Sequence, residues 1–368
     1  MSIFVTGGAG FIGTNFLFNW FADTNEKLIN IDKLTYANNY NHIKTLETKK
    51  NCLFFKGDIA DNKLINFLLN KFKPRAIINF AAETHVDNSI EDPYLFMKTN
   101  VIGTQQLLNT TKEYWDKLDR KSKLNFRFIH ISTDEVYGSL NKNEKPFCEK
   151  NNYNPNSPYS ASKASSNLIV RAYFKTYGLP VITTNCSNNY GPYQFPEKLI
   201  PLTIKNALEH KPIQIYGNGQ QVRDWIHVND HCRALKLILE NGCPGEIYNI
   251  GGSNEKTNIN VVYDICQILD QYNKKNVNKY SNLIRFVDDR PGHDQRYAVN
   301  NSKIKNDIGW IPLEDFKLGL NKTIWWYLNY LKNKNLNLTQ EYTLDRNRIK
   351  KSSNVNILKQ TREKNVSF

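Results

Sequence analysis

The chain has 368 residues, of which 40% are hydrophobic, so it can hold two domains or one large α/β domain with an elaborated end. No apolar run approaches the roughly 20 residues of a membrane span and no early segment resembles a signal peptide, so we expect a soluble cytoplasmic protein without a membrane partner. The net charge is +14, but residues 332–368 hold nine Lys or Arg against three Asp or Glu, and no nucleic-acid motif is recognisable, so an anionic small molecule is favoured over a nucleic acid.

The cysteines are scattered along the chain without any C-x-x-C pair. They are Cys52, Cys148, Cys186, Cys232, Cys243 and Cys266. This spacing argues against a disulfide framework and against a zinc site. We therefore expect buried or incidental thiols and no metal.

The first predicted elements are a short strand at residues 2–6, a glycine-rich loop and a helix. The loop reads GGAGFIG from Gly7 to Gly13, which fits both G-x-G-x-x-G and G-x-x-G-x-x-G. In these patterns the missing side chains let backbone amides approach a pyrophosphate at the N-terminus of a helix. The loop therefore predicts a dinucleotide site.

A second predicted strand, residues 27–31, ends at Asp32, about 20 residues after the glycines. An acidic side chain there can accept hydrogen bonds from the adenosine ribose hydroxyls and repels a 2′-phosphate. This favours NAD over NADP, although Lys33 next to it is a cation that could serve NADP.

Two more strands, residues 52–56 and 76–80, run into GDI and AAET, and helical stretches at 62–72 and 93–115 follow them. Strands that alternate with helices predict a parallel, doubly wound sheet of the Rossmann type. The small residues after the fourth strand leave room for a flat cofactor.

The stretch FRFIHISTDEVYG, residues 126–138, is the predicted reaction centre. Its apolar residues alternate and then give way to Ser132, Thr133, Asp134 and Glu135, so a buried strand should end in hydroxyl and carboxyl groups. By itself such a pair is more often a solvated loop or a helix cap. The elements around it must decide between the two interpretations.

The next helix has clear boundaries, with Ser157-Pro158 at its start and Gly178 at its end. It contains Tyr159 and Lys163, which lie on one helical face because they are four residues apart. Y-x-x-x-K occurs four times in the chain, but only this copy opens a capped helix after the strand that ends in Ser132-Thr133.

After a sixth strand, residues 181–185, the alternation breaks down. Prolines, a turn at 216–219 and helices predicted at 231–240, 260–271 and 318–331 indicate a smaller mixed α/β C-terminal lobe for the substrate. The expected division is a cofactor domain at 1–188, joined by parts of 222–250, a substrate lobe at 189–331, and a polar basic tail at 332–368.

Several segments together resemble a known family. GGAGFIG, NIDKLTYA, AAETHVDNS, ISTDEVYG, SPYSASKASS, TNCSNNYGPYQFPEKLIP and RPGHDQRY are similar to the nucleotide-sugar 4,6-dehydratases of the extended short-chain dehydrogenase/reductases. The likeness is greatest to the members that act on dTDP-glucose, and it covers residues 1 to about 330. Similar stretches occur in enzymes that act on UDP-glucose in rhamnose formation, so the resemblance leaves both nucleotides open.

The resemblance implies NAD-dependent dehydration of a nucleoside-diphosphate glucose to the 4-keto-6-deoxy sugar. Tyr159 would take the C4 hydroxyl proton, and Thr133 would bind the C4 oxygen. Glu135 would take the C5 proton and Asp134 would protonate the departing C6 hydroxyl. Lys163, which would also bind the ribose, and the positive nicotinamide ring are expected to lower the pKa of Tyr159.

The resemblance also assigns the binding residues. Those for the cofactor would be Gly7, Gly10, Phe11, Ile12, Gly13, Asp32, Lys33, Leu34, Thr35, Asp58, Ile59, Ala81, Ala82, Thr99, Tyr159, Lys163 and Asn189. Those for the sugar nucleotide would be Thr84, Thr133, Asn188, Lys198, Leu199, Tyr216, Arg223, Asn258, Arg290 and His293. Arg223 and Arg290 would clamp the diphosphate. Without the family, surface ion pairs with Asp224 and Asp289 are the commoner interpretation of the two arginines, and a capping or surface histidine is that of His293.

Two other functions remain open from the sequence. A sugar-nucleotide epimerase of the same fold needs no acid and base beyond Thr133, so the pair Asp134-Glu135 disfavours it. A binding protein that has lost catalysis predicts damage at Thr133, Tyr159 or Lys163, and all three are present. The family's architecture further implies a homodimer paired through the helices at 93–115 and 158–177.

Overall fold

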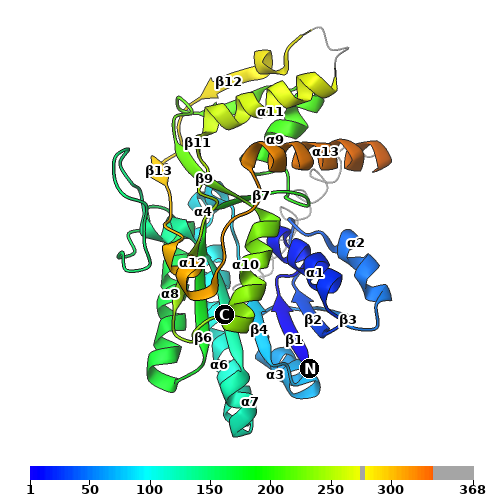
Figure 1. Ribbon diagram of the computed structural model, residues 1–368, viewed down its shortest axis with the longest axis vertical. Helices are drawn as coiled ribbons and strands as arrows, with labels where there is room; N and C mark the ends of the chain where they lie inside the picture. Colours follow the sequence, from blue (N-terminus) through cyan, green and yellow to red (C-terminus); the bar gives the residue numbers. More distant parts are fainter. Residues whose placement is uncertain (274–277, 335–368) are drawn as a thin grey trace, which may run out of the picture.

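The computed structural model describes residues 1–273 and 278–334 (Figure 1). Its larger part is a seven-stranded sheet in the order β10-β6-β5-β4-β1-β2-β3. The strands are β1 (Ser2–Thr6), β2 (Lys27–Asp32), β3 (Cys52–Lys56), β4 (Ala76–Asn79), β5 (Arg127–Thr133), β6 (Val181–Cys186) and β10 (Ile247–Ile250). All neighbouring pairs are parallel, which confirms the predicted Rossmann-type sheet.

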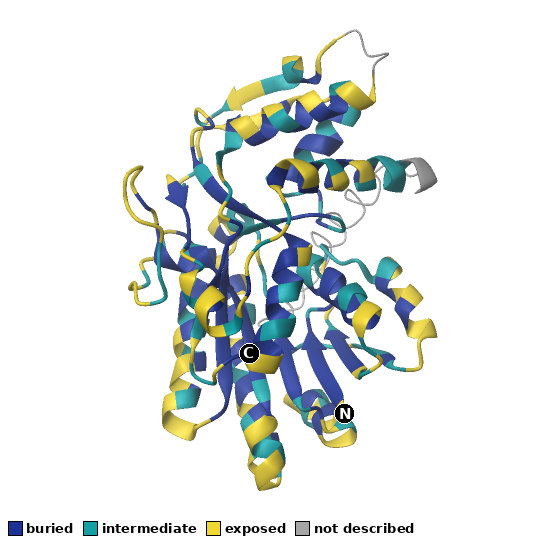
Figure 2. Cartoon of the chain, in the orientation of Figure 1, coloured by how far each residue is buried: buried dark blue, intermediate teal, exposed yellow. Residues whose placement is uncertain are grey.

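Helices cover both faces of this sheet. One layer contains α1 (Phe11–Asp23), α10 (Val228–Asn241) and α12 (Ser302–Ile308), and the other contains α3 (Asn62–Phe72), α6 (Thr104–Asp116) and α8 (Pro158–Tyr177). Successive side chains of a strand point to opposite faces, so in β1 Ile3 and Val5 pack in the first layer and Phe4 in the second. The strands other than the edge strand β3 are therefore largely buried on both faces (Figure 2).

The smaller mixed lobe is also confirmed, and it lies at the top of Figure 1. One of its sheets joins β7 (Asn188–Tyr190), β9 (Val222–His227), β11 (Glu255–Thr257) and β13 (Arg296–Tyr297), and a second pairs β8 (Ile213–Tyr216) with β12 (Ile284–Val287). Its helices are α9 (Leu199–Leu208), α11 (Asn258–Tyr272) and α13 (Phe316–Lys334). These helices and strands share a core of their own.

The remaining elements are short. They are α2 (Tyr40–Ile43), α4 (Val86–Glu91), α5 (Pro93–Phe96) and α7 (Arg120–Asn125), the 3₁₀ segments η1 (Lys44–Thr48), η3 (Asp134–Tyr137) and η4 (Tyr280–Leu283), and the π-helical turn η2 (Met97–Gly103). The helix expected over 93–115 is thus three consecutive segments, α5, η2 and α6. In the described part of the chain, no helix is both long and apolar enough to cross a membrane.

The last helix differs from its prediction. It begins at Phe316 and continues to Lys334, so it is longer than residues 318–331 and takes the first residues of the predicted tail. Trp325 on this helix is 58% exposed, because Phe316, Leu320 and Ile324 form the face that packs into the lobe. The rest of the predicted tail, residues 335–368, lies outside the described residues.

Candidate active site

The predicted cofactor residues lie where strands of the sheet end. Gly7 follows β1, Asp32 ends β2, Asp58 follows β3, Ala81 follows β4, and Thr133 ends β5. Because the strands are parallel, these positions share the carboxyl edge of the sheet, where open α/β proteins bind ligands. The C-terminal lobe lies over the same edge (Figure 1).

The glycine loop has the close backbone contacts that its sequence predicts. Gly7 has φ +69°, and a Cβ on it would lie 2.5 Å from the Ala81 amide nitrogen. A Cβ on Gly13 would lie 2.4 Å from the Gly7 carbonyl oxygen. Gly10 precedes α1, and no side chain caps that helix, so its first amides are open to an anion.

Asp32 supports this loop. Its two carboxylate oxygens accept hydrogen bonds from the Ala9 amide at 2.9 Å and from the Leu34 amide at 2.7 Å. Burial raises its pKa, while the two amide bonds act in the opposite direction. Lys33 beside it forms an ion pair with Asp58 at 2.8 Å.

Tyr159 and Lys163 lie in the first two turns of α8. Ser157 caps this helix and exchanges hydrogen bonds with Ser160, so the predicted start is confirmed. The Lys163 ammonium donates a 2.7 Å hydrogen bond to the Ile131 carbonyl oxygen and so ties α8 to β5. Tyr159 is 7% exposed and Lys163 is 3% exposed.

Burial shifts both pKa values in the direction that favours the neutral form of each side chain. It lowers the pKa of Lys163 to about 8. It raises the pKa of Tyr159 well above its usual value, and the charge of Glu135 acts in the same direction, whereas a hydrogen bond with the Thr133 hydroxyl opposes it. In the protein alone desolvation dominates, so the lowering expected from the sequence depends on the positive nicotinamide ring.

Asp134 and Glu135 follow directly in η3, which Thr133 caps. The Thr133 hydroxyl accepts a hydrogen bond from the Glu135 amide and donates one to Asp134 Oδ1, each at 3.3 Å. Asp134 is 1% exposed, and its Oδ2 has no hydrogen-bond partner among the described residues. The stretch therefore carries its carboxyl groups at the buried end of a strand.

The two carboxyl groups have different surroundings. Burial raises the pKa of Asp134 well above its usual value, and the charges of Glu135 and Asp224 raise it further. Burial also raises the pKa of Glu135, but cations oppose the rise. They belong to Arg290, Arg223 and Lys198. Asp134 is therefore the group more strongly held in its protonated form.

Arg223 reaches this region from the lobe. Its guanidinium donates to the Val222 carbonyl at 2.8 Å and to the Asp294 carbonyl at 2.9 Å, and it stacks 4.3 Å from the centre of the Tyr297 ring. The alternative ion pair with Asp224 is wrong, because that carboxylate accepts hydrogen bonds from backbone amides instead.

Arg290 pairs across the site with Asp87, Nη1 to Oδ1, at 3.1 Å. The Tyr216 hydroxyl donates to Oδ2 of the same carboxylate at 3.1 Å. The alternative pair of Arg290 with Asp289 is wrong, since His293 occupies Asp289 at 2.6 Å, and the His293 side chain is largely buried.

Other predicted residues lie near these groups. Lys198, just before α9, donates a 2.7 Å hydrogen bond to the Thr84 carbonyl after β4. Asn188 and Asn189 lie on β7, and the Asn189 amide oxygen bonds with Nδ1 of His231 at 2.9 Å. The remaining predicted residues are Phe11 and Ile12 at the start of α1, Leu34 and Thr35 after β2, Ala82 after β4, Thr99 in η2, and Asn258 at the start of α11.

Some predicted residues also have apolar surroundings. Side chains that pack into or against the apolar cores are those of Phe11, Ile12, Leu34, Ile59, Ala81 and Leu199. Conversely, the sequence did not single out Asp87 or His231. Asp87 lies within the segment AAETHVDNS, where an acidic side chain three residues after Thr84 could have indicated a site residue. Nothing local marks His231.

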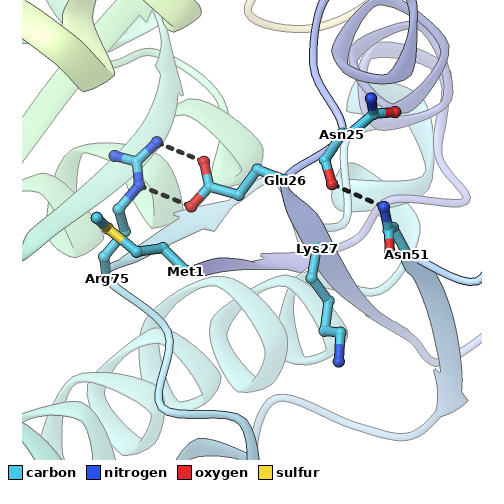
Figure 3. Close-up of a pocket in the computed structure, with 6 residues that line it drawn as sticks. All are labelled: Met1, Asn25, Glu26, Lys27, Asn51 and Arg75. Atoms are coloured by element: carbon cyan, nitrogen blue, oxygen red, sulfur yellow. Dashed lines mark hydrogen bonds and ion pairs between the residues drawn. The ribbon is translucent and has the colours of Figure 1, made fainter.

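An open hollow of about 580 Å³ lies away from this site, where β1 and β2 begin (Figure 3). Two of its charged groups are paired with each other, since Arg75 binds both carboxylate oxygens of Glu26 at 2.7 and 2.8 Å. The Asn51 amide donates to the Asn25 carbonyl at 2.7 Å. The hollow lies where β1 and β2 begin, whereas the predicted site residues lie where the strands end, so it is not the candidate site.

Comparison with known proteins agrees with this geometry. A family model described as GDP-mannose 4,6 dehydratase matches residues 4–323. A dTDP-glucose 4,6-dehydratase of Xanthomonas campestris pv. campestris is 52% identical over 325 residues, which are 88% of this chain and 92% of that protein.

Two solved structures add detail. The dTDP-glucose 4,6-dehydratase of Bacillus anthracis, in complex with NAD, has a TM-score of 0.80 at 46% identity, and the match covers 90% of this chain and 98% of that one. The enzyme of Streptomyces venezuelae, with NAD and TYD bound, has a TM-score of 0.82 at 41% identity with the same coverage. The chain therefore belongs to the dTDP-glucose 4,6-dehydratases, within the extended short-chain dehydrogenase/reductase family.

Proposed function

We propose that the protein is an NAD-dependent hydro-lyase that converts dTDP-glucose to the 4-keto-6-deoxy sugar by C4 oxidation, elimination of water across C5 and C6, and reduction at C6. Two adjacent carboxyl groups, Asp134 and Glu135, support this most directly, because they lie at the buried end of β5 close enough to Tyr159 to raise its pKa. The activity named for relatives up to 52% identical supports the same reaction.

The residues present fit NAD. The amides at the start of α1 suit a pyrophosphate, and the side-chain-free loop at Gly7 and Gly13 has the close packing that such a site needs. Asp32 suits the ribose hydroxyls, and the ion pair with Asp58 leaves Lys33 less available to a 2′-phosphate. Bound NAD would accept the hydride from C4, return it to C6, and by its positive charge favour the phenolate of Tyr159.

Tyr159 and Thr133 act at C4. Tyr159, as the phenolate, takes the C4 hydroxyl proton while the hydride leaves C4 and the ketone forms, and the Thr133 hydroxyl, which bonds with Tyr159, binds the C4 oxygen. Lys163 fixes the first turns of α8 on β5 through Ile131, so both groups are held on rigid elements.

The C5 proton becomes acidic once C4 is a ketone, and the two carboxyl groups then divide the elimination between them. Asp134, whose pKa is raised well above the usual value, keeps a proton to give to the departing C6 hydroxyl. The cations of Arg290, Arg223 and Lys198 favour the ionised form of Glu135, which takes the C5 proton.

The same cations bind the nucleotide diphosphate. A guanidinium can bond two phosphate oxygens at once, and Arg223 is held rigidly by two carbonyl groups and the Tyr297 ring. We assign the other sugar-nucleotide contacts to residues 189–331 of the lobe and to Thr84 and Asn188 at the sheet edge.

The test is incubation of the purified protein with NAD and either dTDP-glucose or UDP-glucose, with measurement of the 4-keto sugar. We expect turnover of dTDP-glucose, and faster turnover of UDP-glucose would transfer the assignment to that nucleotide. An epimerase would instead produce the C4 epimer of the sugar without loss of water. Formation of the epimer alone, or no turnover of either compound, would refute the dehydratase.

We also propose a homodimer. Large apolar side chains are exposed on α4, α5, η2 and α8, namely Ile90, Tyr94, Leu95, Met97, Ile102 and Leu168. Exposed apolar side chains on neighbouring helices are typical of an interface between subunits. Light scattering at micromolar concentration should give twice the mass of one chain, and Ile102→Glu should shift the protein toward the monomer. A monomeric wild-type protein would contradict the proposal.

A further inference from the structure

Asp87 connects the two parts of the molecule. It lies in the first turn of α4, and its two carboxylate oxygens accept hydrogen bonds from Arg290 and from Tyr216, each at 3.1 Å. These partners lie 203 and 129 residues further along the chain, in the C-terminal lobe. One carboxylate therefore joins the sheet edge to two residues expected to bind the sugar nucleotide.

The contact leaves part of Arg290 free. Asp87 takes only Nη1, and among the described residues neither Nε nor Nη2 of Arg290 has a hydrogen-bond partner. Nε and Nη2 form the side edge of a guanidinium, as in Arg75, where the same two atoms bind both oxygens of Glu26. The edge that Asp87 leaves unpaired, whose Nε is buried, therefore has the two donors needed to bind two oxygens of an anion in the site.

We propose that Asp87 is a positioning residue for the substrate diphosphate, which holds Arg290 and Tyr216 across the site with Nε and Nη2 of the guanidinium unpaired. This inference rests on the proposed function. The carboxylate is ionised at neutral pH, because the bond with Arg290 and its charge lower the pKa of Asp87 against the effect of burial. It therefore anchors the cation without neutralising the donors that face the anion.

The opposite role would be competition. A carboxylate that occupies the place of the diphosphate must be displaced by the substrate, so its removal would strengthen binding. The observed contact favours positioning, because a competing anion would take the bidentate edge of the guanidinium, and Asp87 does not.

The experiment compares Asp87→Asn with Glu240→Gln, a charge-matched control at an exposed position of α10. For Asp87→Asn we expect the Kd of dTDP, measured by calorimetry, and the KM of dTDP-glucose to rise about tenfold, with kcat within about twofold. Glu240→Gln should match the wild type. Asp87→Glu, which keeps the charge, should restore part of the affinity and supplies the test if Asp87→Asn does not fold.

A double-mutant cycle separates positioning from a general loss of structure. If Asp87 acts through Arg290, then Asp87→Asn should add little to the loss of dTDP affinity already caused by Arg290→Gln. Unchanged or tighter dTDP binding by Asp87→Asn, or the same loss in both backgrounds, would overturn the inference. A wild-type protein that neither binds dTDP nor turns over dTDP-glucose would instead refute the proposed function.

Discussion

The carboxyl edge of the sheet and the lobe above it contribute to one site in different ways. At the edge, Asp134, Tyr159 and Lys163 are each under 10% exposed, and burial moves every one of their pKa values toward the neutral form. In the lobe, Tyr216 is 42% exposed, and Arg290 forms an ion pair with Asp87. The edge of the sheet thus sets the protonation of the acid and base groups that carry out the reaction. The lobe supplies the charges that bind the substrate.

The largest effect should come from the edge. Glu135→Gln or Asp134→Asn should each lower the rate of 4-keto sugar formation by about 10²- to 10⁴-fold, because a general base or acid is lost. Binding of NAD, measured by calorimetry, should be unchanged. The control is Glu240→Gln, an exposed residue of α10, which should leave both quantities alone. Near-normal turnover in both edge variants would contradict the assigned roles.

A lobe substitution should change a different constant. Arg223→Lys loses the stacking on Tyr297 and the planar pair of bonds to Val222 and Asp294, so we expect KM to rise about tenfold with kcat changed less than about threefold. Arg120→Lys on exposed α7 is the matched control. A fall in kcat at constant KM would place Arg223 with the edge residues.

Acid should weaken the fold through two buried histidines. Burial lowers the pKa of His231 to about 3 and that of His130 well below its usual value, so the folded state resists protonation. The unfolded chain binds these protons below about pH 6.5. Below that pH each histidine lowers the free energy of unfolding by about 1.4 kcal/mol per pH unit. The free energy of unfolding, measured in urea at pH 7, 6 and 5, should decrease as the pH is lowered.

The variants sharpen this prediction. His231→Gln should reduce the slope of stability against pH, whereas His210→Gln, at an exposed position, should keep it. Equal slopes in the wild type and His231→Gln would show that this histidine is not protonated on unfolding.

The smallest effect concerns helix caps. Ser157→Ala should lower the free energy of unfolding by about 1 kcal/mol, because α8 loses its capping box. It should also lower kcat, since Tyr159 lies in the same turn. Asp119→Ala, at the cap of α7, should cost a similar free energy without changing activity. Equal activity in the two variants would mean that the first turn of α8 does not position the phenol.

Local patterns predicted the elements better than the contacts between them. The glycine loop, the strand end at Thr133 and the cap at Ser157 are read from neighbouring residues, and each was found as predicted. The pairing of Arg290 with Asp87 instead joins residues 203 positions apart, which no local pattern encodes. The start of α13 was predicted two residues late for a similar reason, because Phe316 joins the helix through its packing in the core of the lobe.

The pKa of Tyr159 shows a second limit. Its sequence spacing from Lys163 places the two side chains on one helical face, but the Lys163 ammonium bonds with Ile131 and desolvation controls the phenol. Spacing gives proximity, whereas protonation depends on how much water the folded chain removes.

The position of β10 affects how the chain can fold. Its residues Ile247–Ile250 pair with Thr183–Cys186 of β6, so the polypeptide leaves the sheet, builds β7, α9, β8, β9 and α10, and only then supplies the seventh strand. During synthesis one edge of β6 therefore stays unpaired until residue 250 has been made. Unpaired strand edges associate with other chains. A fragment that stops at residue 188 should aggregate, although it contains the whole glycine loop and the first six strands.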